Sequence, residues 1–374
     1  MAFGSRRAAR RLAEAAAIVA ATGSPDDTAH TSDPLHRARP ERHGLVPDDV
    51  VTADPVVGAE EAAVRAAALR GDWRPAARTL HRIGQNWESR AIWVRALATI
   101  AANEDGWLRE WRAAEPKSPD AAVVHADSLV TLAWQVRSTE RAEHVSSEQF
   151  ATFFRILEEA VQACRAAVAL APADPTPWAT LLAVAKGLQW DAIAFEQVWT
   201  ELVNRAPTHR AGHDRALSYW CAKWLGSHEK MFEFAWQAGE KAPVLAVLPL
   251  VAAFEYWAQE GSPSMFAEPR MQAAADTVRA GWLELAGRDS HYAQHDRAMV
   301  ATTLTFGGRG EEGLAEFRIL GTRADAGRWH YFPPAPHKFL QLRRLACLQS
   351  EITEPGRHVS ADADRHSDVN PHSR

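Results

Sequence analysis

The stretch from Pro172 to Pro243 decides the fold class of this chain. It reads PADPTPWATLLAVAKGLQWDAIAFEQVWTELVNRAPTHRAGHDRALSYWCAKWLGSHEKMFEFAWQAGEKAP. Its three unit-ending prolines, Pro172, Pro207 and Pro243, follow apolar segments in Leu-Ala-Pro, Arg-Ala-Pro and Lys-Ala-Pro, and they lie 35 and 36 residues apart. Because proline cannot donate a hydrogen bond to the preceding turn, each one ends a helix and lets the next pair of helices begin. The stretch therefore predicts two consecutive units of paired helices.

The same helical spacing extends on both sides of this stretch. Apolar residues recur three and four positions apart from about residue 60 to about residue 348, and short turns with Gly, Pro, Asp or Ser separate the segments. No segment alternates apolar and polar residues over the length of a strand, so we expect no strands. The expected helices are 60–70, 74–83, 88–102, 105–114, 119–136, 148–170, 176–187, 191–204, 210–225, 229–241, 244–259, 267–286, 290–306, 311–320 and 335–348.

The two units carry small and aromatic residues at characteristic places. The first has Trp178, Leu181, Leu182, a turn at 189–190, Ala194 and Val198, and the second has Ala216, Tyr219, a turn at 226–227, Phe232 and Ala235. In this pattern the units resemble the tetratricopeptide repeat family. The resemblance implies an all-α fold, a right-handed superhelix of antiparallel helix pairs, with a concave groove that binds proteins or peptides. A generic solenoid of helical hairpins is the alternative fold.

The two ends of the chain differ from the repeat region. Residues 1–21 combine four arginines with an alanine-rich run, which predicts an isolated basic amphipathic helix. Residues 22–57 are rich in Pro, Asp, His and Arg without helical or strand periodicity, so we expect a disordered linker there. The helical-repeat solenoid is expected over 58–349. Residues 350–374 have almost no apolar content and are expected to form a disordered tail.

Composition and motifs bear on the class of function. The formal net charge of -5 gives no basic surface for nucleic acid, and no apolar run is long enough for a transmembrane segment. Three widely spaced cysteines predict buried thiols in a reducing cytoplasm, and the Arg-rich, Lys-poor composition suggests a bacterial genome of high GC content. A nucleophile elbow, a phosphate-binding loop and a dinucleotide fingerprint are all missing from the sequence. We therefore expect no cofactor, the sequence favours a non-enzyme over an enzyme while leaving the choice open, and the oligomeric state stays open as well.

One motif occurs twice, with 82 residues between the copies. The first copy contains His209, His213, Asp214 and Arg215, and the second contains His291, His295, Asp296 and Arg297. Two histidines four positions apart share one face of a helix and, with a carboxylate, can hold a transition metal. The simpler interpretation is that each set begins a helix, with the aspartate near its positive end.

A third interpretation places both sets on a ladder of polar residues along the concave groove. His125 and Asp127, near the start of another expected first helix, form a weaker third rung. In such a groove, arginine side chains can grip carboxylates of an extended peptide. The leading hypothesis is therefore a cytoplasmic scaffold or adaptor that binds a protein or peptide partner. The alternative is a metal-dependent enzyme or small-ligand binder that uses the duplicated histidines, and a further possibility is a module whose basic N-terminal helix engages a membrane surface or another protein.

Overall fold

The protein is all-α over the part of the chain that the structure describes. A computed structural model describes residues 2–21, 34–137, 146–286, 290–332 and 336–353. Within these ranges no strand forms, and a single isolated bridge joins Thr52 to Arg323. None of the helices in these ranges is both long enough and apolar enough to cross a lipid bilayer.

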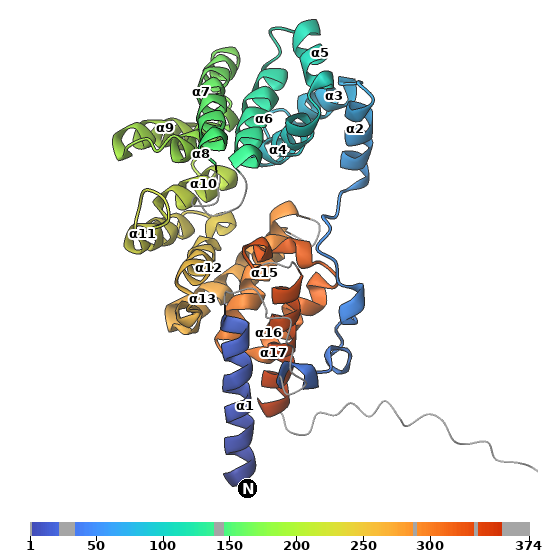
Figure 1. Ribbon diagram of the computed structural model, residues 1–374, viewed down its shortest axis with the longest axis vertical. Helices are drawn as coiled ribbons and strands as arrows, with labels where there is room; N and C mark the ends of the chain where they lie inside the picture. Colours follow the sequence, from blue (N-terminus) through green and yellow to red (C-terminus); the bar gives the residue numbers. More distant parts are fainter. Residues whose placement is uncertain (1, 22–33, 138–145, 287–289, 333–335, 354–374) are drawn as a thin grey trace, which may run out of the picture.

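The chain forms one helix after another (Figure 1). The first helices are α1 (Ala2–Ala20), α2 (Ala59–Leu69), α3 (Arg74–Ile83), α4 (Trp87–Asn103), α5 (Gly106–Ala114), α6 (Pro119–Arg137), α7 (Ser147–Leu170), α8 (Thr176–Gly187) and α9 (Ala192–Arg205). They are followed by α10 (Arg210–Trp220), α11 (His228–Gly239), α12 (Leu248–Glu260), α13 (Pro269–Thr277), α14 (Glu284–Ala286), α15 (His291–Phe306), α16 (Gly310–Leu320) and α17 (His337–Thr353). Most expected helices are confirmed with boundaries within a few residues.

Local sequence signals set the helix ends. Pro172 and Pro207 each lie two residues beyond the last residue of a helix, which confirms their expected role as stops. At the start of α7 the Ser146 hydroxyl accepts from the Gln149 backbone N–H while the Gln149 side chain accepts from the Ser146 N–H. This capping box satisfies two of the N–H groups that a helix start leaves unpaired.

Three expected helices differ from the observed ones. The helix expected over 210–225 ends at Trp220, because the chain turns back so tightly that a Cβ added to Gly226 would lie 1.9 Å from the Trp220 carbonyl oxygen. The helix expected from 244 begins at Leu248, after a 3-10 turn over Pro243–Leu245. The helix expected over 267–286 changes to a π-helix over Val278–Leu283.

Successive helices pack against each other, and more distant ones close the interior. The neighbouring pairs α6 and α7, α8 and α9, α10 and α11, and α15 and α16 each pack side by side, while α4 lies against α6, α8 and α10. The side chains of Trp107, Trp111, Trp257 and Trp329 are fully buried between helices. The three cysteines, Cys164, Cys221 and Cys347, are also buried and unpaired, as expected.

The N-terminal helix is not isolated, in contrast to the expectation. Ala15 and Val19 on α1 are buried, and α1 lies beside α17 (Figure 1). The Lys338 ammonium donates to the carbonyl oxygens of Val19 and Ala21 at 2.9 and 2.7 Å, and the Trp257 indole N–H donates to Ala20 at 2.8 Å. These donors satisfy the last carbonyl groups of α1, which its own helix leaves unpaired.

Residues 34–57 also differ from the expected disordered linker. They form 3-10 turns over Pro34–Arg37, Pro40–His43 and Asp48–Val50, and Leu35 and Leu45 are buried against the C-terminal helices. The Arg318 guanidinium donates to the His43 carbonyl at 2.7 Å. The remainder of the expected linker, 22–33, lies outside the described residues. At the other end α17 continues to Thr353, and the rest of the expected tail, 354–374, lies outside the described residues as well.

Candidate functional site

The first copy of the duplicated motif forms the buried N-terminal end of α10. The His209 Nδ1 accepts from the Gly212 backbone N–H at 3.0 Å and so caps the helix. The His213 Nδ1 lies 3.0 Å from the His209 carbonyl oxygen. The rings of His213 and Trp199 are arranged edge to face, with 4.9 Å between their centroids. Both imidazoles are buried, which disfavours the charged form and lowers the pKa of His209 to about 3 and that of His213 to about 4.

The two copies of the motif contact each other through a buried ion pair. The Arg210 guanidinium donates to both carboxylate oxygens of Asp296 at 2.9 and 2.8 Å, and the Trp282 indole N–H donates to the same carboxylate at 2.6 Å. Arg210 also lies over the ring of Tyr292, with 5.1 Å between the guanidinium carbon and the ring centroid. Asp214 completes the cluster at 3.2 Å from Arg210. The copies therefore join α10 to α15.

The third pair of sequence candidates enters a second buried cluster. Asp127 on α6 accepts from Arg215 at 2.9 Å, lies 3.2 Å from Arg95 and accepts from the Thr180 hydroxyl at 3.0 Å. Two arginines hold the pKa of the Asp127 carboxyl below its usual range even though burial alone would raise it. His125, two residues earlier on α6, makes none of these contacts, and burial lowers its pKa to about 4.

The remaining candidates divide between the interior and a cleft. Arg297 pairs with Glu316 on α16, and both side chains are buried. His291 and His295 line a cavity of about 750 Å³ between α4 and α15, with their ring centroids 5.7 Å apart. Burial lowers the pKa of His295 to about 4. No group of three His, Cys, Asp or Glu side chains with a geometry suited to a metal ion occurs among the described residues.

These placements give the motif copies a common structural role. His209, His213, Asp127, Asp296 and Arg297 are buried, so they hold helices together inside the protein. Among the sequence candidates, His291 and His295 line the cavity of about 750 Å³, and His125 lines a smaller one of about 270 Å³. The buried members of the set therefore offer no surface to a partner.

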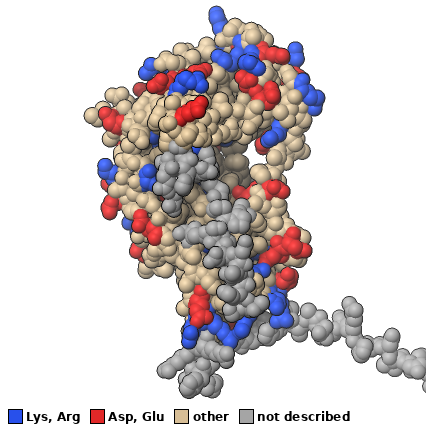
Figure 2. All heavy atoms as spheres, viewed as in Figure 1, with Lys and Arg blue, Asp and Glu red and all other residues tan. Residues whose placement is uncertain are grey.

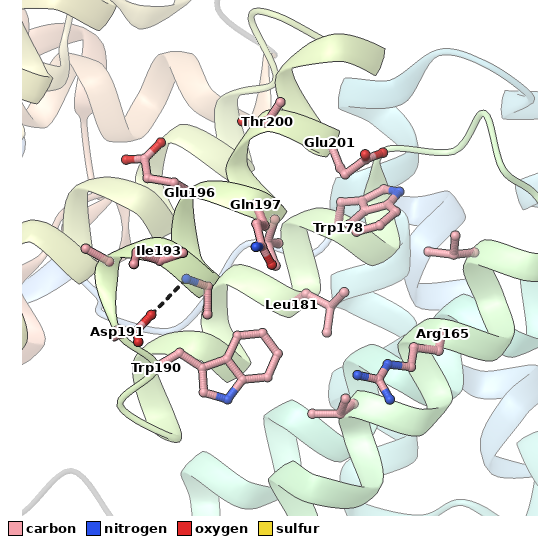
Figure 3. Close-up of a pocket in the computed structure, with 15 residues that line it drawn as sticks. Arg165, Trp178, Leu181, Trp190, Asp191, Ile193, Glu196, Gln197, Thr200 and Glu201 are labelled. Carbon is pink, nitrogen blue, oxygen red and sulfur yellow. Dashed lines mark hydrogen bonds between the residues drawn. The ribbon is translucent and has the colours of Figure 1, made fainter.

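An open groove of about 1290 Å³ lies between α7 and α9, with α8 as its floor (Figure 3). Both α7 and α9 pack against α8. Trp178 stands near one end of the groove and Trp190 near the other, with Leu181 between them. Ile193 on the α9 side is 74% exposed, although isoleucine is normally buried. The groove thus presents aromatic and aliphatic surface to solvent.

Charged side chains border the groove asymmetrically. Arg165 lies on the α7 side, and Asp191, Glu196 and Glu201 lie on the α9 side (Figure 3). Glu201 is partly neutralised by Arg205, whose Nη1 donates to it at 2.6 Å. Asp191 caps α9 by accepting from the Ala194 N–H at 2.9 Å, and burial raises the pKa of Glu196. The α9 border is therefore acidic and the α7 border basic.

The sequence contained one overlooked signal for this groove. Phe195, Val198 and Leu202 form the buried face of α9, and Ile193 falls outside that face. Ile193 is informative because it lies in the same groove as Trp190 and Leu181, since a contiguous exposed apolar surface marks a candidate binding site.

The face of the molecule shown in Figure 2 carries charges of both signs over its described residues. On the face shown in Figure 2, Lys and Arg side chains are interspersed with Asp and Glu side chains over the described residues. Such mixing is typical of a solvated surface and gives no continuous track for a phosphate backbone.

The fold and the groove define an all-α protein with an exposed apolar channel between paired helices. No family model, no curated protein and no solved structure matches the chain. Its function is therefore inferred from its own geometry.

Proposed function

We propose that this chain is a tetratricopeptide-like helical solenoid that acts as a protein-binding scaffold, and that the groove between α7 and α9 holds an amphipathic helix of the partner. The observation that carries this proposal is the apolar channel with Trp178 and Trp190 near its two ends and the exposed Ile193 beside it. Aromatic anchors in a concave apolar site are typical of the energetic centre of protein interfaces.

The charges at the border specify the partner further. A helix lying in the groove would place one flank beside Asp191 and Glu196 and the other beside Arg165. Opposite charges across an interface favour the correct orientation and exclude partners of the wrong sign. The partner helix is therefore expected to carry Lys or Arg along one flank, an acidic residue on the other, and an apolar stripe that faces Leu181.

Repeat architecture supports a scaffold role without enzyme chemistry. In solenoids each pair of helices contacts mainly its neighbours, so extended grooves arise between successive pairs. In the proposed solenoid the groove between α7 and α9 would have this origin, because each of these helices follows its neighbour in one of the pairs α6–α7 and α8–α9. A cytoplasmic location in a bacterium remains part of this proposal.

Site-specific photocrosslinking in the producing cell tests the proposal. A photoreactive residue at Ile193 is expected to capture one segment of one partner, and the sequence of that segment should show a basic flank and an apolar stripe. Leu285 is the matched control, because it is also 74% exposed but lies far from the groove residues in the sequence, on α14. Ile193→Asp should abolish co-purification of that partner, whereas Leu285→Asp should not. Equal captures at both positions, or unchanged co-purification with Ile193→Asp, would refute the groove.

A further inference from the structure

Two cationic side chains share one pair of indole rings away from the groove. The guanidinium carbon of Arg137, at the end of α6, lies 5.4 Å from the Trp134 ring centroid and 5.3 Å from that of Trp224. The Lys186 ammonium on α8 lies 4.5 and 4.8 Å from the same two centroids. The two rings meet edge to face with centroids 5.5 Å apart. Both cations and both indoles therefore belong to one compact cluster.

Among the described residues, no carboxylate pairs directly with either cation of this cluster, and Glu255 acts on Lys186 without forming an ion pair with it. Neither Arg137 nor Lys186 makes an ion pair with any residue that the structure describes, and the Lys186 ammonium donates only to the Ser218 hydroxyl, at 3.0 Å. The nearby cation Lys223 shows the contrast, because it pairs with Glu255 at 2.6 Å. Aromatic faces attract cations, but they do not neutralise charge as a carboxylate does.

The pKa of the Lys186 ammonium is shifted by burial and by the charges around it. Burial lowers the pKa of this ammonium to about 8, the positive charges of Lys223 and Arg137 act in the same direction, and Glu255 acts against them. Burial likewise lowers the pKa of Arg137. An anion that binds beside two partly buried cations stabilises them, because it offsets their mutual repulsion.

We propose that Arg137 and Lys186 form a binding site for the oxyanion of a small ligand, a phosphate or carboxylate group that bridges the guanidinium and the ammonium. A guanidinium presents parallel N–H groups to two oxygens of such an anion. An ammonium has three donors, and Ser218 takes one of those on Lys186, which leaves two for the ligand. Trp134 and Trp224 fix both cations in place before the anion arrives.

The site is separate from the groove of the proposed function. None of Arg137, Lys186, Trp134 and Trp224 lines the groove between α7 and α9. Loss of oxyanion binding would leave the groove proposal intact, and loss of the partner would leave the oxyanion site intact.

The pH dependence of binding follows from the groups that face Lys186. These groups are Arg137 from α6, Lys223 and Cys221 from the segment after α10, and Glu255 from α12. The oxyanion binds the ammonium form, whose proton is lost above pH 8 in the free protein. For benzoate, whose charge does not change over this range, affinity should therefore be constant below about pH 7 and fall about tenfold per pH unit above pH 8, until the raised pKa of the complex is reached.

Titration of the intact protein with inorganic phosphate, and separately with benzoate, tests the site. The readouts are tryptophan fluorescence and the thermal midpoint, at constant ionic strength maintained with sodium chloride. At least one anion should bind saturably, and Lys186→Met or Arg137→Met should weaken it by about tenfold or more. Lys230→Met is the matched control, because Lys230 is exposed and lies 5.5 Å over the Trp220 ring, and it should change nothing. Preference for phosphate or for benzoate identifies the source of the oxyanion.

Three results would overturn the site. The first is the absence of a saturable response to either anion. The second is a response that persists in both Met variants. The third, which needs only the unmodified protein and so does not depend on the folding of any variant, is a benzoate affinity that stays constant from pH 7 to pH 10.

Discussion

The buried pair of Arg210 and Asp296 offers the sharpest test of how the helices are held together. The side chains are 3% and 1% exposed, and two hydrogen bonds of 2.8 and 2.9 Å join them. Asp296→Asn keeps the shape of the side chain but removes its charge. Arg210 stays charged, because its pKa lies above the ordinary value owing to Asp214 and Asp296, and either acid alone favours the charged form.

The expected cost follows from the charge that is left behind. Removing one partner of a buried ion pair typically costs about 3–5 kcal/mol, since the other charge stays buried without compensation. Arg210 retains Asp214 at 3.2 Å and the Val244 carbonyl at 2.8 Å, so the lower end of that range, about 3 kcal/mol, is expected here. With a urea dependence of about 3 kcal/mol per molar for a protein of this size, the unfolding midpoint should fall by about 1 M.

Urea unfolding followed by circular dichroism measures this shift. The control is Asp105→Asn, which breaks the pair of Asp105 and Arg109, with side chains 54% and 70% exposed, and should cost less than about 1 kcal/mol. The double variant Arg210→Met with Asp296→Leu removes both charges and should be more stable than Asp296→Asn alone. Two results would refute the idea that uncompensated charge governs this contact: a loss of unfolding free energy below about 1 kcal/mol for Asp296→Asn, or a double variant that is less stable than Asp296→Asn.

Three further predictions concern stability and reactivity. Burial lowers the pKa of His213 in the folded state to about 4, so the protein should lose about 1.4 kcal/mol of unfolding free energy per pH unit as the pH falls from about 6.5 toward 4. Urea unfolding from pH 7.5 to pH 4.5 measures this dependence, and His213→Leu should make the unfolding free energy depend less steeply on pH. Gly226→Ala should lower the thermal midpoint strongly, because its Cβ would lie 1.9 Å from the Trp220 carbonyl oxygen, whereas Gly281→Ala meets no atom within 4 Å and should be neutral or stabilising. Burial raises the pKa of all three thiols, so a disulfide reagent should label none of them in the folded protein and all of them in urea: Cys164, Cys221 and Cys347.

The helices could be predicted from the sequence because their signals are local. Prolines, caps and apolar spacing act within one or two turns, and they placed most helix boundaries within a few residues. The exceptions depend on contacts over longer range or on backbone geometry. The tight return of the chain at Gly226, which ends α10 early, has no signature in the apolar pattern.

The N-terminal segments show why composition alone was insufficient. Residues 34–57 are polar on average, but a few apolar side chains such as Leu35 and Leu45 suffice to fix them against the C-terminal helices. Lys338 reaches the end of α1 across more than 300 residues of chain. A long-range contact of this kind cannot be derived from the periodicity of either segment.

The duplicated motif identified a repeated structural position without revealing its partners. Arg210 and Asp296 come from different copies but not from equivalent positions, since Tyr292 stands where the first copy has Arg210 and Asp214 stands where the second has Asp296. The sequence could not show that Arg210 and Asp296 face each other. The groove has no repeated signature in the sequence, since its clearest residue, Ile193, breaks the amphipathic pattern of its helix.

The buried clusters and the groove are linked through α8. On one side of this helix, the Thr180 hydroxyl donates to Asp127 on α6. Asp127 also pairs with Arg215 on α10 and with Arg95 on α4, so the cluster fixes α8 to these helices. On another side, Trp178 and Leu181 form the floor of the groove. A binding surface loses less entropy on complex formation when its floor is already rigid. Conversion of Asp127 to Asn should therefore weaken binding of the partner helix as well as stability, even though Asp127 lies outside the groove.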